Sequence, residues 1–442
     1  MSQCDVCGRE FARKGGLEKH KNNKKPCKAP VKLIQQALQE AGVPVEPLEE
    51  FREASKKFNA SSTKEQRAKE GIFFTPKKVR DILFEKLTEL GVTPKIILEP
   101  SFGSGEFIHD ARRIYPNAHI MGVEKNADLY KTVSCSNSNL ACVDFLRWRW
   151  KADLIIGNPP YFIMNTDGMS KKEKMAFDTE NRACMSGRPN IYVRFMYKCL
   201  EENLESGGFL AFIIPTSIYN CSYYQPMRDY IQKNTTIRHL ESLDKPGFYE
   251  TGQDTTLIIL EKKKVNDDYI FKAKNGAVYI TPFFKELRVL TEGTKNLQEL
   301  GLAVKTGNVV WNQVKDKLAT EGTLLVYSSN INNCELKINN LGGKERKQYV
   351  KGIDKPTIDG PVILVERGYG NAFNFNSILM NQKGFYAENH LNVIYAREPG
   401  AESQLDAVIT SFKDPRSLQF VRWFVGNGAI SATELETVVP IF

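Results

Sequence analysis

Several marks of common protein classes are missing from this 442-residue sequence. No apolar run approaches the roughly 18 residues that a membrane-spanning helix needs, and the most apolar stretch, 207–215, has only the length of a strand. The N-terminus carries charged residues such as Asp5 and Arg9 where a secretion signal would need an apolar core. The sequence has no internal repeat and no low-complexity segment. Membrane, collagen-like, coiled-coil and secreted classes are therefore set aside, and we expect an intracellular protein of the cytoplasm or nucleus.

The residues that are present predict a folded protein with a basic N-terminus. Hydrophobic residues make up 41% and charged residues 26%, which is enough apolar surface for a core, and the length predicts about three domains. The formal net charge is +9, and residues 1–30 contribute +5 of it, a local excess that favours nucleic-acid contact. Three of the nine cysteines lie in the first 27 residues, which favours metal binding over disulfides.

These N-terminal cysteines belong to a pattern with the spacing of metal ligands. Two residues separate Cys4 from Cys7, His20 follows after twelve more, and Cys27 after a further six. Two thiolates on a hairpin and two ligands on a following helix satisfy the tetrahedral preference of Zn²⁺. The pattern therefore predicts a zinc site over residues 1–30.

The segment resembles the C2H2 and C2HC zinc fingers, whose small core has apolar residues at the positions of Phe11 and Leu17. Cys27 departs from the family, in which the fourth ligand is usually a histidine after three to five residues. The residues that the resemblance would place against DNA bases are Arg13, Gly16 and Lys19. One finger covers about 3 bp and reads sequence weakly, and it could equally bind RNA or protein.

The rest of the chain divides into three regions. Residues 31–70 have helical periodicity broken by Pro44 and Pro47, and are expected to form a linker with short helices. Residues 71–264 alternate short apolar runs with amphipathic stretches, as in an α/β fold with a mostly parallel sheet. Residues 265–442 are irregular, with short strands near 324–328, 362–366 and 391–396 and a helical tail from Ser411, and are expected to form an α+β domain.

The central region predicts a Rossmann-like sheet. The expected strands are 95–100, 119–124, 140–144, 153–158, 209–215, 237–243 and 255–261, and the expected helices are 78–90, 106–114, 191–204 and 225–233. The last two strands are joined without room for a helix. They should therefore pair as a hairpin, with one of them antiparallel to the rest of the sheet.

The end of the first predicted strand suits a ligand that carries an ammonium group. Glu99 ends this strand, and Gly103 and Gly105 follow in a turn where the backbone can approach a ligand closely. The third glycine of a dinucleotide fingerprint is absent, and a carboxylate at the turn would repel a pyrophosphate.

The next two strand ends suit an adenosine. Glu124 ends the second strand, where a carboxylate can accept hydrogen bonds from both ribose hydroxyls. Asp144 ends the third, beside Phe145, so that a carboxylate can accept the adenine amino proton while the ring packs against the base. An adenosine that carries an amino acid and no phosphate is S-adenosylmethionine, which is therefore the expected cofactor.

The fourth strand runs into Asn158-Pro159-Pro160-Tyr161. The side-chain oxygen of Asn158 and the carbonyl of Pro159 can together hold both hydrogens of an exocyclic amine, and the prolines stiffen the turn. Gripping both hydrogens favours a tetrahedral nitrogen that can attack a methyl group on a positive sulfur. Tyr161 offers a face on which a base could stack, and a base in a duplex would have to be flipped out to reach it.

In this order, the motifs resemble the amino-methyltransferases of restriction–modification type that methylate adenine N6 in DNA, in their gamma arrangement. The other segments that carry the resemblance are 71–76 (GIFFTP), 190–192, 207–215 and 216–220 before residue 265, and 364–371 and 427–435 after it. The resemblance implies that the cofactor is bound by Thr75, Glu99, Glu124, Asp144 and Phe145. It implies that the target base is held by Asn158, Pro159 and Tyr161.

The same resemblance implies double-stranded DNA as partner, a C-terminal target-recognition domain, and in some settings a cognate restriction endonuclease. Bacterial members usually lack a zinc finger, so the fusion suggests a eukaryotic or large-virus origin. Within the C-terminal region, Arg367, Tyr369 and Asn371 follow a strand and are candidates for reading bases. A basic cluster for phosphate contact comprises Lys344, Arg346, Lys347, Lys351 and Lys355; ordinary strand-edge and solvated-loop roles fit these residues equally well.

Three alternatives stay open on the sequence. Cytosine N4 methylation uses the same chemistry, although cytosine enzymes more often have Ser or Asp at the position of Asn158. Methylation of RNA bases or of protein glutamine uses the same motif, although the glutamine enzymes usually lack a large C-terminal domain. A non-catalytic DNA-binding protein would not need suitable residues at all four strand ends.

Overall fold

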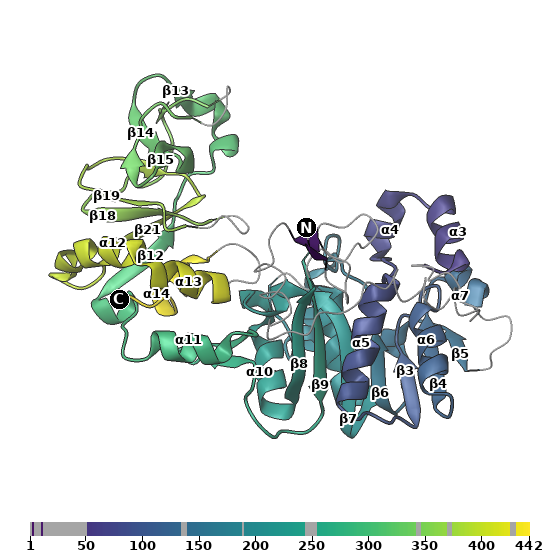
Figure 1. Cartoon of the computed structure of the whole chain (residues 1–442). Helices are drawn as coiled ribbons and strands as arrows, with labels where there is room; N and C mark the ends of the chain where they lie inside the picture. The colour runs from purple at the N-terminus through teal and green to yellow at the C-terminus, as the bar shows by residue number, and fades with distance from the viewer. Residues whose placement is uncertain are drawn as a thin grey trace. The chain divides into compact units, whose positions relative to one another are not determined.

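The computed structural model describes residues 51–133, 139–187, 190–243, 254–341, 346–368, 374–424 and 430–442, together with the backbone of two short strands near the N-terminus (Figure 1). The chain forms two compact units, Met1–Glu50 and Phe51–Phe442. In the first unit, β1 (Ser2–Gln3) and β2 (Glu10–Phe11) pair antiparallel. The predicted zinc ligands Cys4, Cys7, His20 and Cys27, and the predicted base-facing Arg13, Gly16 and Lys19, lie outside the described residues.

A seven-stranded sheet forms the centre of the second unit. Its strands are β3 (Ile96–Glu99), β4 (His119–Glu124), β5 (Leu140–Cys142), β6 (Ala152–Gly157), β7 (Leu204–Pro215), β8 (Thr236–Leu243) and β9 (Thr255–Glu261). They lie in the order β5-β4-β3-β6-β7-β9-β8. Only β9 runs antiparallel to its neighbours. The predicted Rossmann-like sheet with one antiparallel strand in its final hairpin is therefore confirmed.

Helices cover both faces of this sheet. The α-helices described between α4 and β9 are α5 (Lys77–Glu89), α6 (Glu106–Ile114), α7 (Ala127–Val133), α8 (Lys171–Asn181), α9 (Ile191–Lys198) and α10 (Gln225–Asn234). In β6, Leu154 and Ile156 pack with α5 and α6, whereas Ile155 packs on the other face with α9 and α10. Figure 1 shows α5 and α6 together on one face. Successive side chains of a strand alternate between faces, so a fully buried sheet needs apolar residues at every position, as here.

Within residues 71–264, two predicted boundaries differ from the structure by more than two residues. The helix expected over 191–204 is α-helical only to Lys198 and continues as a π-helix over Cys199–Asn203. Strand β7 begins at Leu204 rather than 209, and its pairing with β6 shifts register between Ala152 and Leu154.

Part of the predicted linker belongs to the compact second unit. Within 31–70, the described residues form α3 (Glu53–Ser61) and α4 (Lys64–Glu70). Just before α3, Phe51 is buried against Phe74 and Leu129. The N-terminal limit of this unit therefore lies near residue 51.

The C-terminal residues form the expected mixture of strands and helices. Strands β12 (Leu302–Thr306), β21 (Leu391–Ala396), β18 (Val362–Glu366) and β19 (Ser377–Met380) form one antiparallel sheet in that order. A second sheet has the order β13 (Leu318–Ala319), β17 (Tyr349–Val350), β14 (Thr323–Val326), β20 (Tyr386–Ala387). Two hairpins, β10 (Ile270–Lys272) with β11 (Val278–Ile280) and β15 (Ile331–Asn332) with β16 (Glu335–Leu336), complete the strands described there.

The helices of this part are α11 (Phe284–Thr291), α12 (Leu405–Lys413), α13 (Pro415–Phe424) and α14 (Ala432–Thr437), so the helical tail begins before the predicted Ser411. The amide nitrogen of Asn220, which follows β7, donates to Glu434 Oε1 on α14 at 3.1 Å, and both residues are buried. In the part of the chain that the structure describes, no helix is both long and apolar enough to cross a membrane.

Candidate active site

A cavity of about 640 Å³ opens at the carboxyl ends of the parallel strands. Its walls come from the ends of β3, β4 and β6, from the turn after β5, and from residues 69–75 before α5. The predicted site residues that line it are Thr75, Glu99, Gly103, Glu124, Asp144, Phe145, Asn158 and Pro160. Open α/β sheets bind ligands at this edge, and these residues, spread over 86 positions of the sequence, meet there.

Glu99, at the end of β3, is a buried carboxylate with an incomplete set of partners. Its side chain is 2% exposed, and no described residue hydrogen-bonds its Oε2. Burial raises the pKa of Glu99 well above its ordinary value, and repulsion from Glu124 and Glu106 raises it further, whereas Arg80 opposes the shift. A cationic or hydrogen-donating ligand in the cavity would satisfy this oxygen and favour the carboxylate form.

Glu124, at the end of β4, is held by backbone amides. Its Oε2 accepts from the amide of Gly103 at 2.8 Å and its Oε1 from the amide of Asn126 at 2.7 Å. Burial raises the pKa of Glu124, and these amide hydrogen bonds counteract the shift. Each oxygen keeps a second lone pair, so the fixed carboxylate can also accept from ligand hydroxyls.

Asp144 and Phe145 form the wall after β5. Asp144 Oδ1 accepts from the amide of Leu146 at 3.0 Å, and its Oδ2 lies 3.0 Å from Lys125 Nζ. Phe145 is 2% exposed and packs against Phe195, with 5.0 Å between ring centroids. An acidic group therefore lies beside a buried aromatic ring.

The two glycines of the predicted turn have different surroundings. Both Gly103 and Gly105 have positive φ, 53° and 77°, a backbone region that favours glycine. A Cβ at Gly105 would lie 2.8 Å from Val133 Cγ1, so this position is closed by protein. Gly103 lines the cavity, whereas Gly105 is not among the residues that do.

The amide of Asn158 has a fixed orientation. Its Nδ2 donates to the Phe73 carbonyl and to Thr75 Oγ1, each at 3.1 Å, and its Oδ1 accepts from the hydroxyl of Tyr161. A carbonyl oxygen can only accept, so turning the amide over would set two oxygens against each other. The side-chain oxygen is therefore the end of Asn158 that can accept hydrogen bonds from a ligand.

Tyr161 lies below the cavity rather than on its wall. Its side chain is 9% exposed, its hydroxyl donates to the carbonyl of Ile213 at 2.6 Å or to Asn158, and burial raises its pKa well above the ordinary value. Its ring is roughly parallel to that of Phe73 and meets Tyr192 edge-on. The expected stacking face for a base is thus covered in this structure, while the neighbouring Phe162 lines the cavity.

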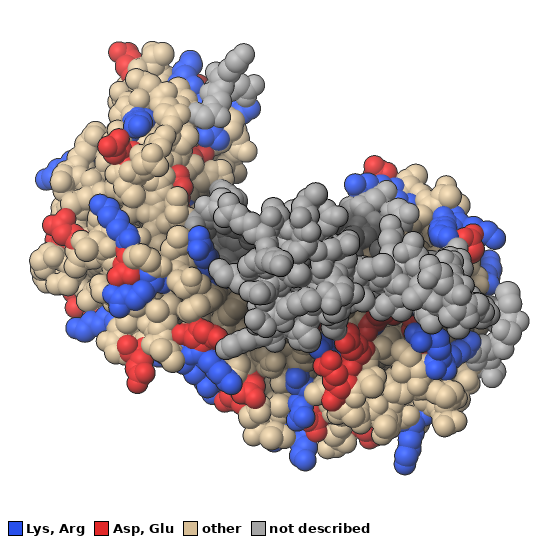
Figure 2. All heavy atoms as spheres, in the orientation of Figure 1, with Lys and Arg blue, Asp and Glu red and all other residues tan. Residues whose placement is uncertain are grey.

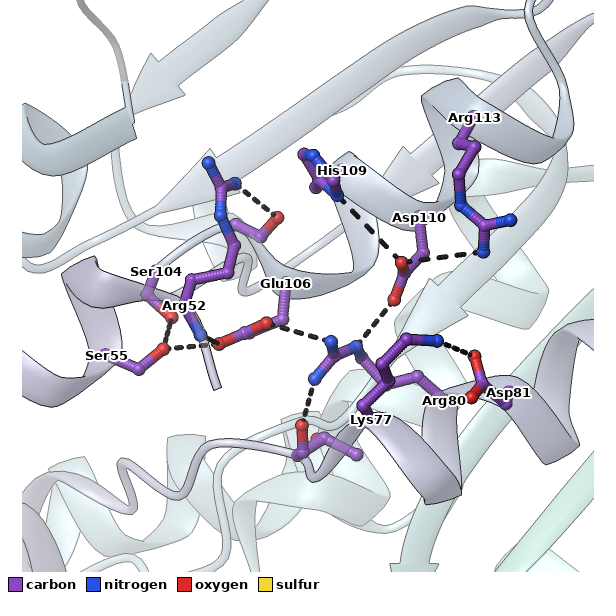
Figure 3. Close-up of polar contacts among 12 residues, drawn as sticks. Arg52, Ser55, Lys77, Arg80, Asp81, Ser104, Glu106, His109, Asp110 and Arg113 are labelled. Atoms are coloured by element: carbon purple, nitrogen blue, oxygen red, sulfur yellow. Dashed lines mark hydrogen bonds and ion pairs between the residues drawn. The ribbon is translucent and has the colours of Figure 1, made fainter. Parts of the chain in front are cut away.

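A buried ionic network that the sequence analysis missed supports this site (Figure 3). Arg80, 3% exposed, pairs with Asp110 at 2.6 Å and with Glu106 at 3.1 Å, and also donates to the carbonyl of Thr75. The Ser55 hydroxyl on α3 contacts Ser104 Oγ at 2.6 Å and Glu106. The network joins α3, the segment before α5 and the glycine turn. An arginine and two acids on amphipathic helices gave no local signal for it.

The predicted DNA contacts in the C-terminal part are only partly described. Tyr369, Asn371 and Lys344 lie outside the described residues. Arg367 donates through Nη1 to the carbonyl of Asn389 at 3.2 Å, and its buried Nε has no hydrogen-bond partner among the described residues. Arg346 lies over the ring of Trp311, with 4.6 Å to the centroid. Figure 2 shows Lys and Arg interspersed with Asp and Glu over this part, in keeping with its nearly balanced charge.

The sheet order, together with a cavity lined by carboxylates and a glycine turn at the carboxyl ends of the strands, is that of S-adenosylmethionine-dependent methyltransferases. A family model described as the Eco57I restriction-modification methylase matches residues 108–248. The Type II methyltransferase M.CvrRI of Paramecium bursaria Chlorella virus XZ-6E is 31% identical over 406 residues, which cover 89% of this chain and 99% of that protein. The modification methylase CviBIII of Paramecium bursaria Chlorella virus NC1A is 30% identical over 407 residues, 89% of this chain and all 100% of that protein.

Among solved structures, the type IIG restriction endonuclease BpuSI matches with a TM-score of 0.43 and 12% identity, over 94% of this chain and 64% of that chain. The chain belongs to the Type II methyltransferases of restriction–modification type, which are site-specific DNA methyltransferases that use S-adenosylmethionine. The described residues contain no group of three or more His, Cys, Asp or Glu side chains that could hold a metal ion.

Proposed function

We propose that this enzyme methylates N6 of adenine, and that Asn158 and Pro159 accept the two hydrogens of the adenine amine. The observation that carries the proposal is the fixed amide of Asn158, whose two N–H hydrogens are engaged by Phe73 and Thr75. Its oxygen keeps a lone pair beside the one that faces Tyr161. No described residue hydrogen-bonds the carbonyl of Pro159. An asparagine rather than Ser or Asp at position 158 favours adenine over cytosine N4.

The chemistry follows from these two acceptors. The N6 lone pair of adenine is delocalised into the ring, and two hydrogen bonds from the amine to placed oxygens favour a tetrahedral nitrogen with its lone pair free. The bound cofactor supplies a methyl group on a positively charged sulfur. The N6–carbon bond would form as the sulfur–carbon bond breaks, and the leaving group would be a neutral thioether. Asn158 and Pro159 would therefore need no basic partner, the extra proton on N6 would leave afterwards to solvent, and alignment by fixed dipoles would provide the acceleration.

The cofactor roles follow the geometry of the cavity. Glu99 would bind the ammonium group through its unpaired Oε2, and Glu124 would accept from the ribose hydroxyls. Asp144 and Phe145 would bind the adenine, with Gly103 allowing close approach of the backbone. Thr75 would contact the amino-acid end of the cofactor, and Gly105 would shape the turn without contact.

The target adenine would be flipped out of double-stranded DNA to reach Asn158, since a base inside a duplex is inaccessible. Pro160 would shape the turn. The ring of Phe73 covers one face of Tyr161 and Tyr192 meets the ring edge-on, so a base would stack on Tyr161 only after these rings move. Without such movement, Tyr161 would orient Asn158 through its hydroxyl, whose single hydrogen is shared between Asn158 Oδ1 and the Ile213 carbonyl.

Residues outside the catalytic part, 71–264, would supply specificity. Residues 265–442 would act as the target-recognition domain, with Arg367, Tyr369 and Asn371 among its DNA contacts. Residues 1–30 would bind Zn²⁺ through Cys4, Cys7, His20 and Cys27, and Arg13 and Lys19 would contact nucleic acid. The order of motifs favours the gamma group. The fused finger and the Chlorella-virus relatives favour a large-virus origin, and a cognate endonuclease is possible, as in restriction–modification systems.

The test is long-read sequencing of DNA from cells that express the chain, with Asn158→Ala as the matched control. We expect N6-methyladenine in one sequence context in cells with the wild-type chain, and none there in cells with the variant. N4-methylcytosine in place of methyladenine, or methyladenine that persists with the variant, would overturn the proposal.

A further inference from the structure

One short segment, residues 71–75, forms a wall of the cofactor cavity and also contacts residues 158–161, which we call the catalytic loop. We call residues 71–75 the strap. Each of its residues lines the cavity. Gly71, with φ of 68°, lies so close to the loop that a Cβ would come within 2.8 Å of the amide nitrogen of Tyr161 and 2.9 Å of Pro160 Cβ. The ring of Phe73 lies 6.4 Å from that of Tyr161, at an interplanar angle of 24°. The strap therefore touches both halves of the active site.

Within the strap, Thr75 contacts the catalytic Asn158 through a hydroxyl group. Thr75 Oγ1 accepts from Asn158 Nδ2 at 3.1 Å, although the two residues are 83 positions apart. A hydroxyl has one hydrogen and two acceptor lone pairs. Because Asn158 Nδ2 is the donor in this contact, the hydrogen of the Thr75 hydroxyl points elsewhere.

No described residue accepts a hydrogen bond from the Thr75 hydroxyl. Thr75 is only 3% exposed, yet it lines the cavity. Its backbone cannot easily move, since its carbonyl accepts from the buried Arg80, which is itself paired with Asp110 and Glu106. The Thr75 hydroxyl is therefore held in place. It accepts a hydrogen bond from Asn158 and can donate one to a ligand in the cavity.

We propose that Thr75 is a positioning residue that links the two halves of the site: a bound cofactor that accepts the Thr75 hydrogen stabilises the Asn158 orientation that receives the target amine. The inference rests on the proposed function of Asn158. Hydrogen bonds in such a chain strengthen one another. Binding free energies are reciprocal, so cofactor binding should tighten the binding of target DNA, and DNA should tighten the binding of cofactor by the same factor.

The experiment measures the dissociation constant of a duplex that contains the mapped target site, by fluorescence anisotropy, with and without saturating S-adenosylhomocysteine. In the wild-type protein we expect the cofactor product to tighten DNA binding about fivefold, at the low end of usual coupling factors. Thr75→Ser keeps the hydroxyl and should keep this factor. Thr75→Val has a similar shape without the hydroxyl and should lower the factor to about one.

Two further variants distinguish the proposed coupling through Thr75 and Asn158 from a loss of cofactor binding and from the general effect of removing a buried hydroxyl. Asn158→Ala leaves the cavity side of Thr75 intact, so it should bind S-adenosylhomocysteine like the wild type by calorimetry and yet lose the cofactor-dependent tightening of DNA. Thr235→Val removes another buried threonine hydroxyl, which donates to the Ile231 carbonyl at 2.8 Å at the end of α10, and should keep the full factor. This control excludes a general effect of losing a buried hydroxyl.

The outcomes distinguish this inference from the proposed function. A wild-type protein that transfers no methyl group to DNA refutes the proposed function before any variant is compared. A wild-type protein that methylates adenine but whose DNA affinity is the same with and without S-adenosylhomocysteine refutes the link alone. Retention of the wild-type factor by Thr75→Val also refutes the link, because the Phe73 carbonyl would then suffice to orient the Asn158 amide. Its retention by Asn158→Ala refutes the link as well, because the coupling would then not pass through Asn158.

Discussion

At the scale of single residues, the site depends on buried or half-buried polar side chains that keep some of their hydrogen-bonding capacity unused. No described residue hydrogen-bonds Glu99 Oε2, and Asn158 presents only its oxygen, because its amide hydrogens are both engaged. Burial without full pairing is costly to the folded chain, so such groups are expected where a ligand completes the set. This expectation can be tested separately for the base and for the cofactor.

For the base, Asn158→Ala should lower the rate of methyl transfer by at least a factor of about 10²–10³, the usual effect of removing one placed dipole from a reacting group. The affinity for S-adenosylhomocysteine should stay near the wild-type value, since Asn158 is assigned to the amine. Single-turnover transfer and calorimetry measure the two quantities. A fully active variant would show that the assigned acceptor is wrong.

For the cofactor, Glu99→Gln should change both stability and affinity in a pH-dependent way. The folded-state pKa of Glu99 is raised above the ordinary 4.5 by burial, Glu124 and Glu106. As the pH rises above 4.5, the unfolded chain therefore releases this proton first, and the folded protein without cofactor loses stability up to the folded-state pKa. Glu99→Gln has no carboxyl group to ionise and should not lose stability in this way. Without cofactor, its melting temperature should therefore exceed that of the wild type by an amount that grows between pH 4.5 and pH 8.

The affinity of Glu99→Gln for S-adenosylhomocysteine should fall by about tenfold or more at pH 8, because a charged hydrogen bond to the ammonium group is lost. The wild-type affinity should rise with pH as Glu99 ionises, and the variant should lack that rise. Glu205→Gln, at an exposed position, is the control. Equal pH dependence in all three proteins would show that Glu99 does not bind the ammonium group.

At the scale of elements, the strap is the piece whose conformation couples most closely to function. It follows α4, precedes α5, and touches the catalytic loop by van der Waals contact at Gly71 and by hydrogen bonds at Phe73 and Thr75. Its support is the network of Arg80 with Glu106 and Asp110. A loop between two helices would be mobile without such support, so we expect the strap to be sensitive to added volume.

Gly71→Ala tests this expectation, with Gly91→Ala as its match. The two glycines have nearly the same φ, 68° and 70°, so both substitutions add about 1 kcal/mol of left-handed strain. Only at Gly71 does the new methyl group collide with backbone, because nothing lies within 4 Å of a Cβ at Gly91.

Gly71→Ala should therefore lose about 1–3 kcal/mol more stability than Gly91→Ala in urea unfolding. Its methyl transfer should also slow at least about tenfold, since a displaced strap no longer orients Asn158. If the two variants have equal stability and equal kcat, the contact between the strap and the catalytic loop contributes neither to folding nor to methyl transfer.

At the scale of the whole molecule, the chain contains the catalytic sheet and also residues 1–50 and 265–442, of which no described residue lines the cavity. The residues from Phe51 to Phe442 form one compact unit, within which Asn220 beside β7 is bonded to Glu434 on α14. The first 50 residues form another unit, which carries the proposed zinc ligands. Specificity and affinity for DNA are therefore expected to respond to changes that leave methyl transfer itself intact.

Cys4→Ser with Cys7→Ser tests this separation. The double variant should lose its zinc, measured by mass spectrometry of the metal, and should bind target DNA more weakly while keeping its rate of transfer at saturating DNA. Cys142→Ser, at an exposed free cysteine of β5, should change none of these. Unchanged DNA affinity in a zinc-free double variant would mean that the finger does not contact DNA.

Much of the catalytic part could be predicted from local pattern. The bounds of β4, α6 and β9 agree with the predicted ranges to the residue, and so do those of β18 and β21 in the C-terminal part. These segments have strong periodicity and clear breaks at both ends. The π-helix after Lys198, whose Cys199 and Leu200 are buried, and the early start of β7, which pairs Leu204 with Ala152 across a register shift, have no local signal in the sequence.

The sequence by itself determined which chemical groups stand at each strand end: Glu99, Glu124, Asp144 and Asn158 follow apolar runs in the order of the strands. That order is enough to bring them to one edge of a parallel sheet, because every strand of a βαβ fold ends on the same side.

Only the tertiary structure decided what these groups do there. In the folded chain, Glu99 is buried near Glu124 and Glu106, and the amide of Asn158 donates to Phe73 and Thr75. The hydroxyl of Tyr161 lies at hydrogen-bond distance from the Ile213 carbonyl on β7. Each of these effects requires residues more than 20 positions apart to meet. The energy of such a contact depends on burial and on hydrogen-bond geometry, which no local spacing of residues specifies.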